Sequence, residues 1–293
     1  MPTNWQHDYE LVTSGSGYVE LSGCSTLRVT GEDRSKFLHN FCTNDINRLL
    51  PGERCEAFLP DVKGKIVGHV FVSVAANEIV LLCINQQAEA IISHLDRYII
   101  REDVQLTDHS TEYRWLLFGH SKPSAFSPFP SISEVLPGSL IGVPENKSEQ
   151  ANLILHKKEL TVCDNEVFNV VRIENKLPLF DIDFDDSNLP QEIDRDQQAI
   201  NFNKGCYLGQ ETIARIDALG HVNKKTVQLG FEGSDLPPQG LELHYHGKSV
   251  GKVTSRCWSP KFKRPIALAM IRRDANQSGT LLDSDFGPAV VLD

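Results

Sequence analysis

The segment with the clearest chemical potential is Lys204-Gly205-Cys206-Tyr207-Leu208-Gly209-Gln210-Glu211. It places Cys206 two residues after Lys204 and just before residues 210–216, which can form at least one helical turn. The unpaired N–H groups of a helix N-terminus and a nearby lysine both favour thiolate over thiol. The segment therefore predicts a lowered pKa for Cys206 and a role as nucleophile or metal ligand. The alternative is a cysteine that packs as a small apolar residue in a glycine-rich turn.

The neighbours of Cys206 have assignable roles. Gly205 and Gly209 can adopt backbone conformations that other residues resist, and Glu211 is suited to the first turn of a helix. Arg215 follows Glu211 by four residues, so we expect an ion pair between them across one helical turn. Tyr207 either stacks on a ligand or fills a domain interface.

The other cysteines carry no metal or disulfide signature. There are seven in all, an odd number, and no two stand at C-x-x-C spacing. This argues against a disulfide framework and against a zinc site, so we predict no metal site. His244 and His246 alternate along a predicted strand but have no third ligand in view. A papain-like Cys–His enzyme is disfavoured because no such signature surrounds any cysteine.

The elements that must hold these residues are mixed helices and strands. The regular βαβ alternation of a doubly wound fold is missing, as are GxGxxG and Walker loops, so the fold class is α+β. Apolar periodicity predicts a helix over 32–41, strands over 66–74 and 78–84, a helix over 87–101, a strand over 113–119, a loop or irregular insertion over 122–144, and a helix over 166–174 capped by Asp164 or Asn165.

The composition changes after Gly220. Short strands separated by glycine and proline predict a small all-β domain, most simply a barrel. The predicted boundary lies at residues 219–225, which divides the chain into 1–220 and 221–293. The predicted strands are 226–231, 241–244, 249–254 and 266–271.

Overall composition narrows the possible functions. The 293 residues are 40% hydrophobic and 23% charged, with no run near the ~20 apolar residues of a membrane helix. A net charge of −10 disfavours generic binding to nucleic-acid backbone. Residues 1–8 show neither a secretory nor a transit signal. We therefore expect a cytosolic protein with no membrane and no direct nucleic-acid partner.

Several segments taken together resemble the folate-binding YgfZ group, relatives of the glycine-cleavage T-protein (aminomethyltransferase). The resemblance covers most of the chain, and no single segment would suffice. The segments are 29–33 with 37–38 and 43–45, then 63–65, 172–174 with Pro178, 189–192, 204–211 with 214–215, and 251–255 with 259–260 and 266–268.

The resemblance implies a body of two interleaved α+β sub-domains that holds tetrahydrofolate or a derivative in a central cavity, followed by a C-terminal β-barrel. It places Glu174 on the pterin ring, since a carboxylate can accept two parallel hydrogen bonds from an aminopyrimidine edge. Lys204, Tyr207 and Arg215 are the further candidate cofactor contacts. The chain departs from T-proteins after Glu174, where Asn175 and Lys176 replace glycines.

A second departure concerns catalysis. T-protein carries a catalytic aspartate in an Asp-Asp pair, and the matching positions here are Gly68 and His69. General acid–base catalysis needs a titratable group within reach of the reacting nitrogen. A lone histidine on an alternating strand is more often structural than catalytic. The resemblance therefore implies that this chain is not an aminomethyltransferase.

Three functions follow as hypotheses. The first is a folate-binding accessory protein for iron–sulfur cluster assembly or repair, and through it for tRNA modification, whose partners are iron–sulfur enzymes or assembly proteins and whose key thiol is Cys206. The second is a one-carbon transfer enzyme that uses folate. The third is a non-catalytic interaction module in which the thiol is inert.

Overall fold

Apolar runs in the first half of the chain pair into an antiparallel five-stranded sheet in the order β3-β4-β5-β2-β6. One face is covered by helices α2 and α3, whose Phe37, Leu38, Ile91 and Leu95 pack against strand residues in a buried cluster. The structure is a computed structural model that describes residues 5–119, 124–126, 129, 131–133 and 138–292. The elements are β2 (Ser25–Thr30), α2 (Arg34–Phe41), β3 (Arg54–Pro60), β4 (Ile66–Val74), β5 (Ile79–Cys83), α3 (Ala88–Asp96) and β6 (Gln105–Asp108).

A second five-stranded sheet, in the order β10-β1-β7-β9-β8, packs on the other face of the first. Their shared core joins Phe71 and Leu82 of the first sheet to Val19, Trp115 and Leu117 of the second. Helix α4 lies on the outer face of the second sheet through a further apolar cluster. The elements are β1 (Gly17–Leu21), β7 (Tyr113–Phe118), β8 (Ser131–Ser133), β9 (Ser139–Pro144), α4 (Ser148–Lys157) and β10 (Thr161–Cys163).

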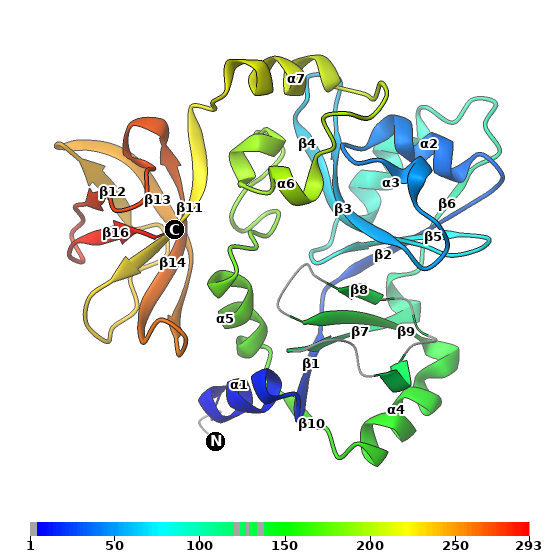
Figure 1. Ribbon diagram of the computed structural model, residues 1–293, viewed down its shortest axis with the longest axis horizontal. Helices are drawn as coiled ribbons and strands as arrows, with labels where there is room; N and C mark the ends of the chain where they lie inside the picture. Colours follow the sequence, from blue (N-terminus) through cyan, green and yellow to red (C-terminus); the bar gives the residue numbers. More distant parts are fainter. Residues whose placement is uncertain (1–4, 120–123, 127–128, 130, 134–137, 293) are drawn as a thin grey trace.

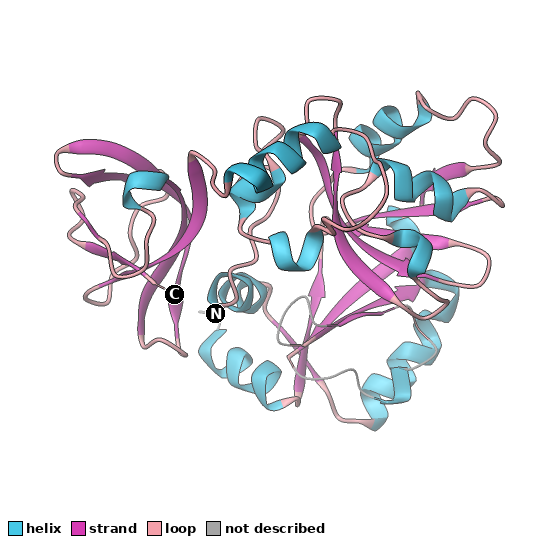
Figure 2. Ribbon diagram, turned by 45° about the horizontal axis from the view of Figure 1, so that its top comes forward, coloured by secondary structure: helices cyan, strands magenta, loops and turns pink. Residues whose placement is uncertain are grey.

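The C-terminal strands form a nearly closed six-stranded barrel in the order β12-β13-β14-β11-β16-β15. An isolated bridge between His244 and Asp283 links the two ends of this order. The barrel has its own apolar core and stands apart from the two body sheets (Figure 2). Its strands are β11 (Lys224–Phe231), β12 (Glu242–Tyr245), β13 (Lys248–Ser259), β14 (Arg264–Arg272), β15 (Leu281–Leu282) and β16 (Ala289–Val291).

Four helices and a short 3₁₀ helix link the sheets to the barrel. Helix α7 runs along the top of the molecule from the body toward strand β11 (Figure 1). Helix α5 packs on the barrel through Val170 and Ile173, which contact Cys257, Ile266 and Leu268. These elements are α1 (Trp5–Ser14), α5 (Glu166–Glu174), η5 (Pro190–Ile193), α6 (Asp196–Ala199) and α7 (Gln210–Leu219).

The observed fold confirms the α+β class and the barrel. Strand β4 and helix α5 begin and end where the apolar periodicity predicts, and the Asp164 carboxylate accepts the N–H of Glu166 at 2.7 Å. The helix predicted over 87–101 ends at Asp96. The loop predicted over 122–144 is wrong for 131–133 and 139–144, which form strands β8 and β9. The parts of that loop at 122–123, 127–128, 130 and 134–137 lie outside the described residues.

Candidate functional site

Cys206 lies in an exposed loop just before helix α7. All seven cysteines fall within the described residues, and Cys206 is the one that is exposed; the other six are buried or half-buried. Burial raises the pKa of Cys24 to about 12 and that of Cys163 to about 11. Thiolate is the reactive form of cysteine, so the fold suppresses the reactivity of these buried thiols and leaves Cys206 open to solvent.

Lys204 anchors the loop that carries Cys206 to the backbone around the end of helix α2. Its ammonium donates hydrogen bonds to the backbone oxygens of His39 at 2.5 Å, Cys42 at 2.8 Å and Asn44 at 2.8 Å. These carbonyls lie in and just after the last turn of helix α2, where a positive charge is favourable. Burial lowers the pKa of Lys204. That Lys204 adds positive charge near Cys206 stays a prediction, and the three donors of its ammonium are used by backbone oxygens.

Two glycines bring the start of α7 against a turn of the first sheet. Gly209 has φ of 76°, and a Cβ there would lie 2.3 Å from the oxygen of Asp61 and 2.9 Å from Cα of Gly64. Gly64 has φ of 78° and lies against Thr212 in the same way. Only glycine fits this contact without displacing backbone. The resemblance segments 63–65 and 204–211 therefore meet in space.

A histidine that sequence reasoning missed lies beside this loop. Nε2 of His39 is 3.7 Å from the position that a Cβ on Gly205 would take. Nδ1 of His39 lies 3.1 Å from Oδ1 of Asp45, outside hydrogen-bond geometry. Burial and, secondarily, the charge of Lys204 lower the pKa of His39. The apolar spacing of α2 gives no sign of this position, because the loop arrives from residue 205.

Tyr207 and Arg215 differ in their surroundings. Tyr207 is buried in an apolar cluster with Phe58, Ile213 and, at its edge, Met270 of the barrel. Its ring thus fills the contact between body and barrel, and the ammonium of Lys204 lies 4.8 Å from the ring centre. Arg215 is exposed, and no ion pair joins it to Glu211 in the described part of the chain. The predicted Glu211–Arg215 pair is therefore wrong.

Glu174 is buried at the contact between α5 and the barrel rather than in an open cavity. Its carboxylate accepts hydrogen bonds from the hydroxyl of Tyr9 at 2.8 Å, the hydroxyl of Ser259 and the backbone N–H of Lys261 at 3.2 Å. A pterin edge would have to displace these donors. The pterin contact at Glu174 therefore stays a prediction.

Arg172, which also lies on helix α5, links this helix to the barrel by side-chain hydrogen bonds as Glu174 does. Its guanidinium donates to Oδ2 of Asp183 at 2.9 Å and to the hydroxyl of Ser255 at 2.7 Å, while Thr254 donates to Oδ1 of Asp183 at 2.6 Å. Arg172 and Asp183 are both buried. The resemblance segments 172–174 and 251–260 are thus joined by side-chain hydrogen bonds and hold the barrel on α5.

The positions where T-protein relatives were expected to carry an acidic pair are packed. A Cβ on Gly68 already meets Ile91 at 2.7 Å. The ring of His69 stacks on Phe58 with 4.8 Å between centres, and its Nε2 bonds Oε1 of Glu56 at 2.8 Å. His69 is buried, as the structural interpretation of this residue predicts.

Glu56 is the centre of a buried ion-pair network that sequence reasoning missed. Both of its oxygens accept hydrogen bonds from the guanidinium of Arg195, and His69 bonds one of them. Burial alone would raise the pKa of Glu56, but the bonds from Arg195 and His69 outweigh it and hold the pKa at about 2. The three residues come from strands β3 and β4 and from the segment before α6, so no local pattern could reveal them.

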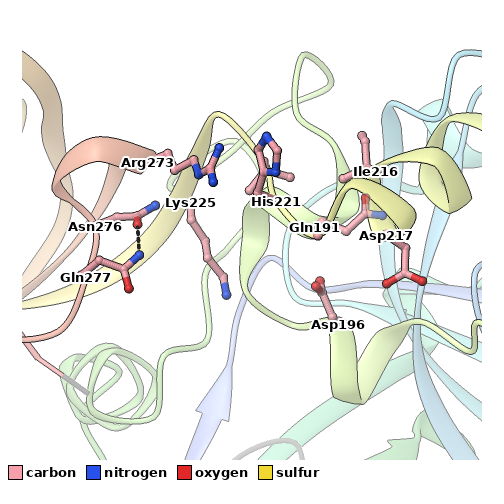
Figure 3. Close-up of a pocket in the computed structure, with 11 residues that line it drawn as sticks. Gln191, Asp196, Ile216, Asp217, His221, Lys225, Arg273, Asn276 and Gln277 are labelled. Atoms are coloured by element: carbon pink, nitrogen blue, oxygen red, sulfur yellow. Dashed lines mark hydrogen bonds between the residues drawn. The ribbon is translucent and has the colours of Figure 1, made fainter.

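A pocket of about 390 Å³ lies at the other end of α7, where the helix meets η5, α6 and the barrel. The side chains that line it include Gln191, Asp196, Asp217, Lys225 and Arg273 (Figure 3). Helix α7 therefore has the exposed thiol before its first residue and a polar pocket at its last turn. Among the described residues, no group of three or more His, Cys, Asp or Glu side chains could hold a metal ion.

Comparison with known proteins shows which family has this architecture. The GCVT N-terminal domain model matches residues 1–118, and the glycine cleavage T-protein C-terminal barrel domain model matches residues 224–289. The tRNA-modifying protein YgfZ of Blochmanniella pennsylvanica is 25% identical over 280 residues, which cover 82% of each chain. The chain belongs to the YgfZ-like proteins of aminomethyltransferase fold.

The wider family is close in fold. The aminomethyltransferase of Bacillus subtilis is 24% identical over 327 residues, covering 97% of this chain and 87% of that protein. The crystal structure of aminomethyltransferase T from Bartonella henselae superposes with a TM-score of 0.86 at 16% identity, over 100% of this chain and 89% of that one, which shows a shared fold. Within the described residues of this YgfZ-like chain, no helix combines the length and apolarity that a bilayer crossing requires.

Proposed function

We propose that this YgfZ-like chain is a folate-binding accessory protein that supports iron–sulfur cluster assembly or repair, and through it tRNA modification, with Cys206 as its key thiol. The observation that carries the proposal is the exposure of Cys206 on an anchored loop, while the other six cysteines are buried or half-buried. The name of the Blochmanniella relative, a tRNA-modifying protein, supports the link to tRNA.

The chemistry of one exposed thiol sets the form of the activity. A thiolate can ligate iron, accept a sulfur atom from a persulfide, or attack a disulfide. One cysteine cannot hold an iron–sulfur cluster alone, so a partner protein or small thiols must supply the remaining ligands. This chemistry needs a reduced thiol, and a reducing cytosol provides it. The proposed partners are therefore iron–sulfur enzymes or assembly proteins in the cytosol.

The folate part of the proposal comes from the T-protein resemblance. The matching domain models cover the N-terminal 118 residues and most of the barrel, the two regions between which α5, η5, α6 and α7 lie. Because Glu174 is already bonded by Tyr9 and Ser259, a folate held near α5 would need contacts other than a free Glu174 carboxylate. A division of the chain into a folate-binding body over 1–220 and a barrel over 221–293 is part of this proposal.

Aminomethyl transfer is the competing activity, since relatives with that name match most of the chain. The structure supplies little for it at the expected position. His69 has one ring nitrogen on Glu56 and a buried ring, so it does not face a ligand cavity. A general base must reach the proton that it removes.

The proposal is tested in cells that lack the native protein. We expect wild-type chain to restore the activity of an iron–sulfur enzyme and Cys206→Ala to leave it at the level of cells without the protein. Asn203→Ala, at an exposed position of the same loop, is the matched control and should restore activity fully. Thermal unfolding of the purified variants checks that both fold. Full restoration by Cys206→Ala would exclude the thiol role.

A further inference from the structure

A groove between helix α2 and the segment after α3 lies close to the Cys206 loop. Its volume is about 340 Å³, and Asn40 of α2 is one of the residues that line it. The backbone oxygen of Asn40 accepts the N–H of Leu208 at 2.9 Å. Because consecutive Cα atoms are about 3.8 Å apart, the Cα of Cys206 lies within about 8 Å of that of Leu208. A molecule seated in the groove is therefore near the thiol.

Three aromatic side chains line this groove. The ring centres of Phe37 and Phe41 are 4.7 Å apart, and those of Phe41 and Tyr98 are also 4.7 Å apart. Phe41 and Tyr98 are half-buried, so their rings are partly open to solvent. Ile100, two residues after Tyr98, is 81% exposed. Aromatic rings with adjoining exposed apolar surface are typical of sites where a side chain of another protein packs.

The charged side chains of the groove differ in whether they are already engaged. Oδ2 of Asp33 accepts a backbone N–H at 3.0 Å, and Oε2 of Glu102 accepts two, at 2.9 and 3.0 Å. Lys36 and Arg101 are exposed, and their side chains make no hydrogen bond or ion pair within the described residues. The charged groups that remain available to a partner are therefore positive, on a chain whose net charge is −10.

We propose that this groove docks an acidic segment of the partner protein that reacts with Cys206, with an aromatic side chain on its rings and carboxylates on Lys36 and Arg101. Opposite charges on the two surfaces steer the partner and set its orientation. A protein segment is favoured over a small ligand because Ile100 extends the apolar surface beyond the residues that line the groove. This docking role rests on the thiol role in the proposed function and not on its folate part.

The test uses synthetic peptides that differ in single properties. The acidic probe is fluorescein-labelled Gly-Asp-Glu-Phe-Glu-Asp-Gly, and the basic control has lysine in place of each acidic residue. Binding to the full chain is followed by fluorescence anisotropy at low and at high salt. We expect the acidic probe to bind at least about fivefold more tightly than the basic probe at low salt, with a smaller difference at high salt because exposed charges are screened. A third probe with serine in place of phenylalanine should bind more weakly than the acidic probe.

The variants reverse the charge of one exposed side chain at a time. They are Lys36→Glu and Arg101→Glu in the groove, with Lys248→Glu on barrel strand β13 as the matched control. We expect each groove variant to weaken binding of the acidic probe by about fivefold, and Lys248→Glu to leave it unchanged. Thermal unfolding checks that each variant folds.

Proximity to the thiol is measured with the same peptides, each extended by a cysteine activated as its 2-thiopyridyl disulfide. The thiolate of Cys206 attacks the sulfur of the probe, a new S–S bond forms, and the S–S bond to the thiopyridyl group breaks and releases thiopyridone. Docking raises the concentration of the probe at the thiol, so the acidic probe should react about fivefold or more faster than the basic one. Uncharged 2,2′-dithiodipyridine should react equally with wild type and Lys36→Glu.

The outcomes separate the docking role from the proposed function. Equal binding of the acidic and basic probes, or binding that both groove variants leave unchanged, overturns the docking role and leaves the proposed function in place. Selective binding without faster exchange at Cys206 overturns the link between the groove and the thiol. A Cys206 that fails to react even with 2,2′-dithiodipyridine contradicts the proposed function, and the docking role that rests on it falls with it.

Discussion

Gly209 and Gly64 lie back to back, so that a Cβ on Gly209 would come within 2.9 Å of Cα of Gly64 and 2.3 Å of the Asp61 oxygen. We expect Gly209→Ala to destabilise the protein by about 3 kcal/mol or more, because the clash is with backbone. Gly220, at the other end of α7, also has positive φ but no atom within 4 Å of a Cβ. Gly220→Ala should cost only about 1 kcal/mol from backbone strain. Urea unfolding measures both, and equal losses would contradict the close contact.

Lys204 holds the thiol loop through three backbone oxygens. Lys204→Met removes the donor and leaves buried carbonyls unpaired, so we expect a loss of about 2–4 kcal/mol in unfolding free energy. Amide hydrogen exchange should also rise at Leu208, whose N–H donates to the oxygen of Asn40 at 2.9 Å. Unchanged exchange at Leu208 would show that Lys204 does not anchor the loop.

Asp196 gives a stability that depends on pH. Its pKa is raised from the ordinary 3.8 to about 6, so the folded state binds its proton more tightly than the unfolded state does. The contribution to stability is full below pH 4 and is lost as pH rises through 6. Asp196→Asn should therefore stabilise the protein at pH 7, by about 1 kcal/mol after allowing for partial solvent screening.

The matching control for Asp196 is the same measurement at pH 3. There the wild-type carboxyl is largely protonated in both the folded and the unfolded state, so the unfolding free energies of variant and wild type should be close. Destabilisation of Asp196→Asn at pH 7 would contradict the assignment.

Glu174 is expected to act in stability rather than in ligand binding. Glu174→Ala leaves the hydroxyls of Tyr9 and Ser259 without their acceptor, so we expect a loss of about 2–3 kcal/mol. The affinity for 5-formyltetrahydrofolate should stay within about twofold of wild type for the folded variant. A tenfold loss of affinity would restore the sequence prediction that this carboxylate holds the pterin.

The elements that could be predicted from the sequence are those whose apolar residues recur at regular local spacing. Strand β4, helix α5 and the barrel strands follow from apolar spacing, and the resemblance segments gave the family. The strands of 131–133 and 139–144 were missed because proline and glycine near them are typical of loops. Arg195 on Glu56, and Gln191 beside Asp196, depend on contacts between distant elements, which spacing along one chain does not reveal. The Glu211–Arg215 pair failed because both side chains are exposed, where such pairs are weak.

The claim that the fold presents Cys206 as a reactive thiol is tested most directly by its rate of alkylation. Folded protein is treated with iodoacetamide at pH 7, and modification of each cysteine is followed by peptide mass spectrometry, with glutathione as the reference thiol. We predict that Cys206 reacts first among the seven, at a rate within about threefold of that of glutathione, because it is exposed to solvent while the other six are buried or half-buried. A rate about tenfold or more below that of glutathione, or faster modification of Cys24 or Cys55, would contradict it.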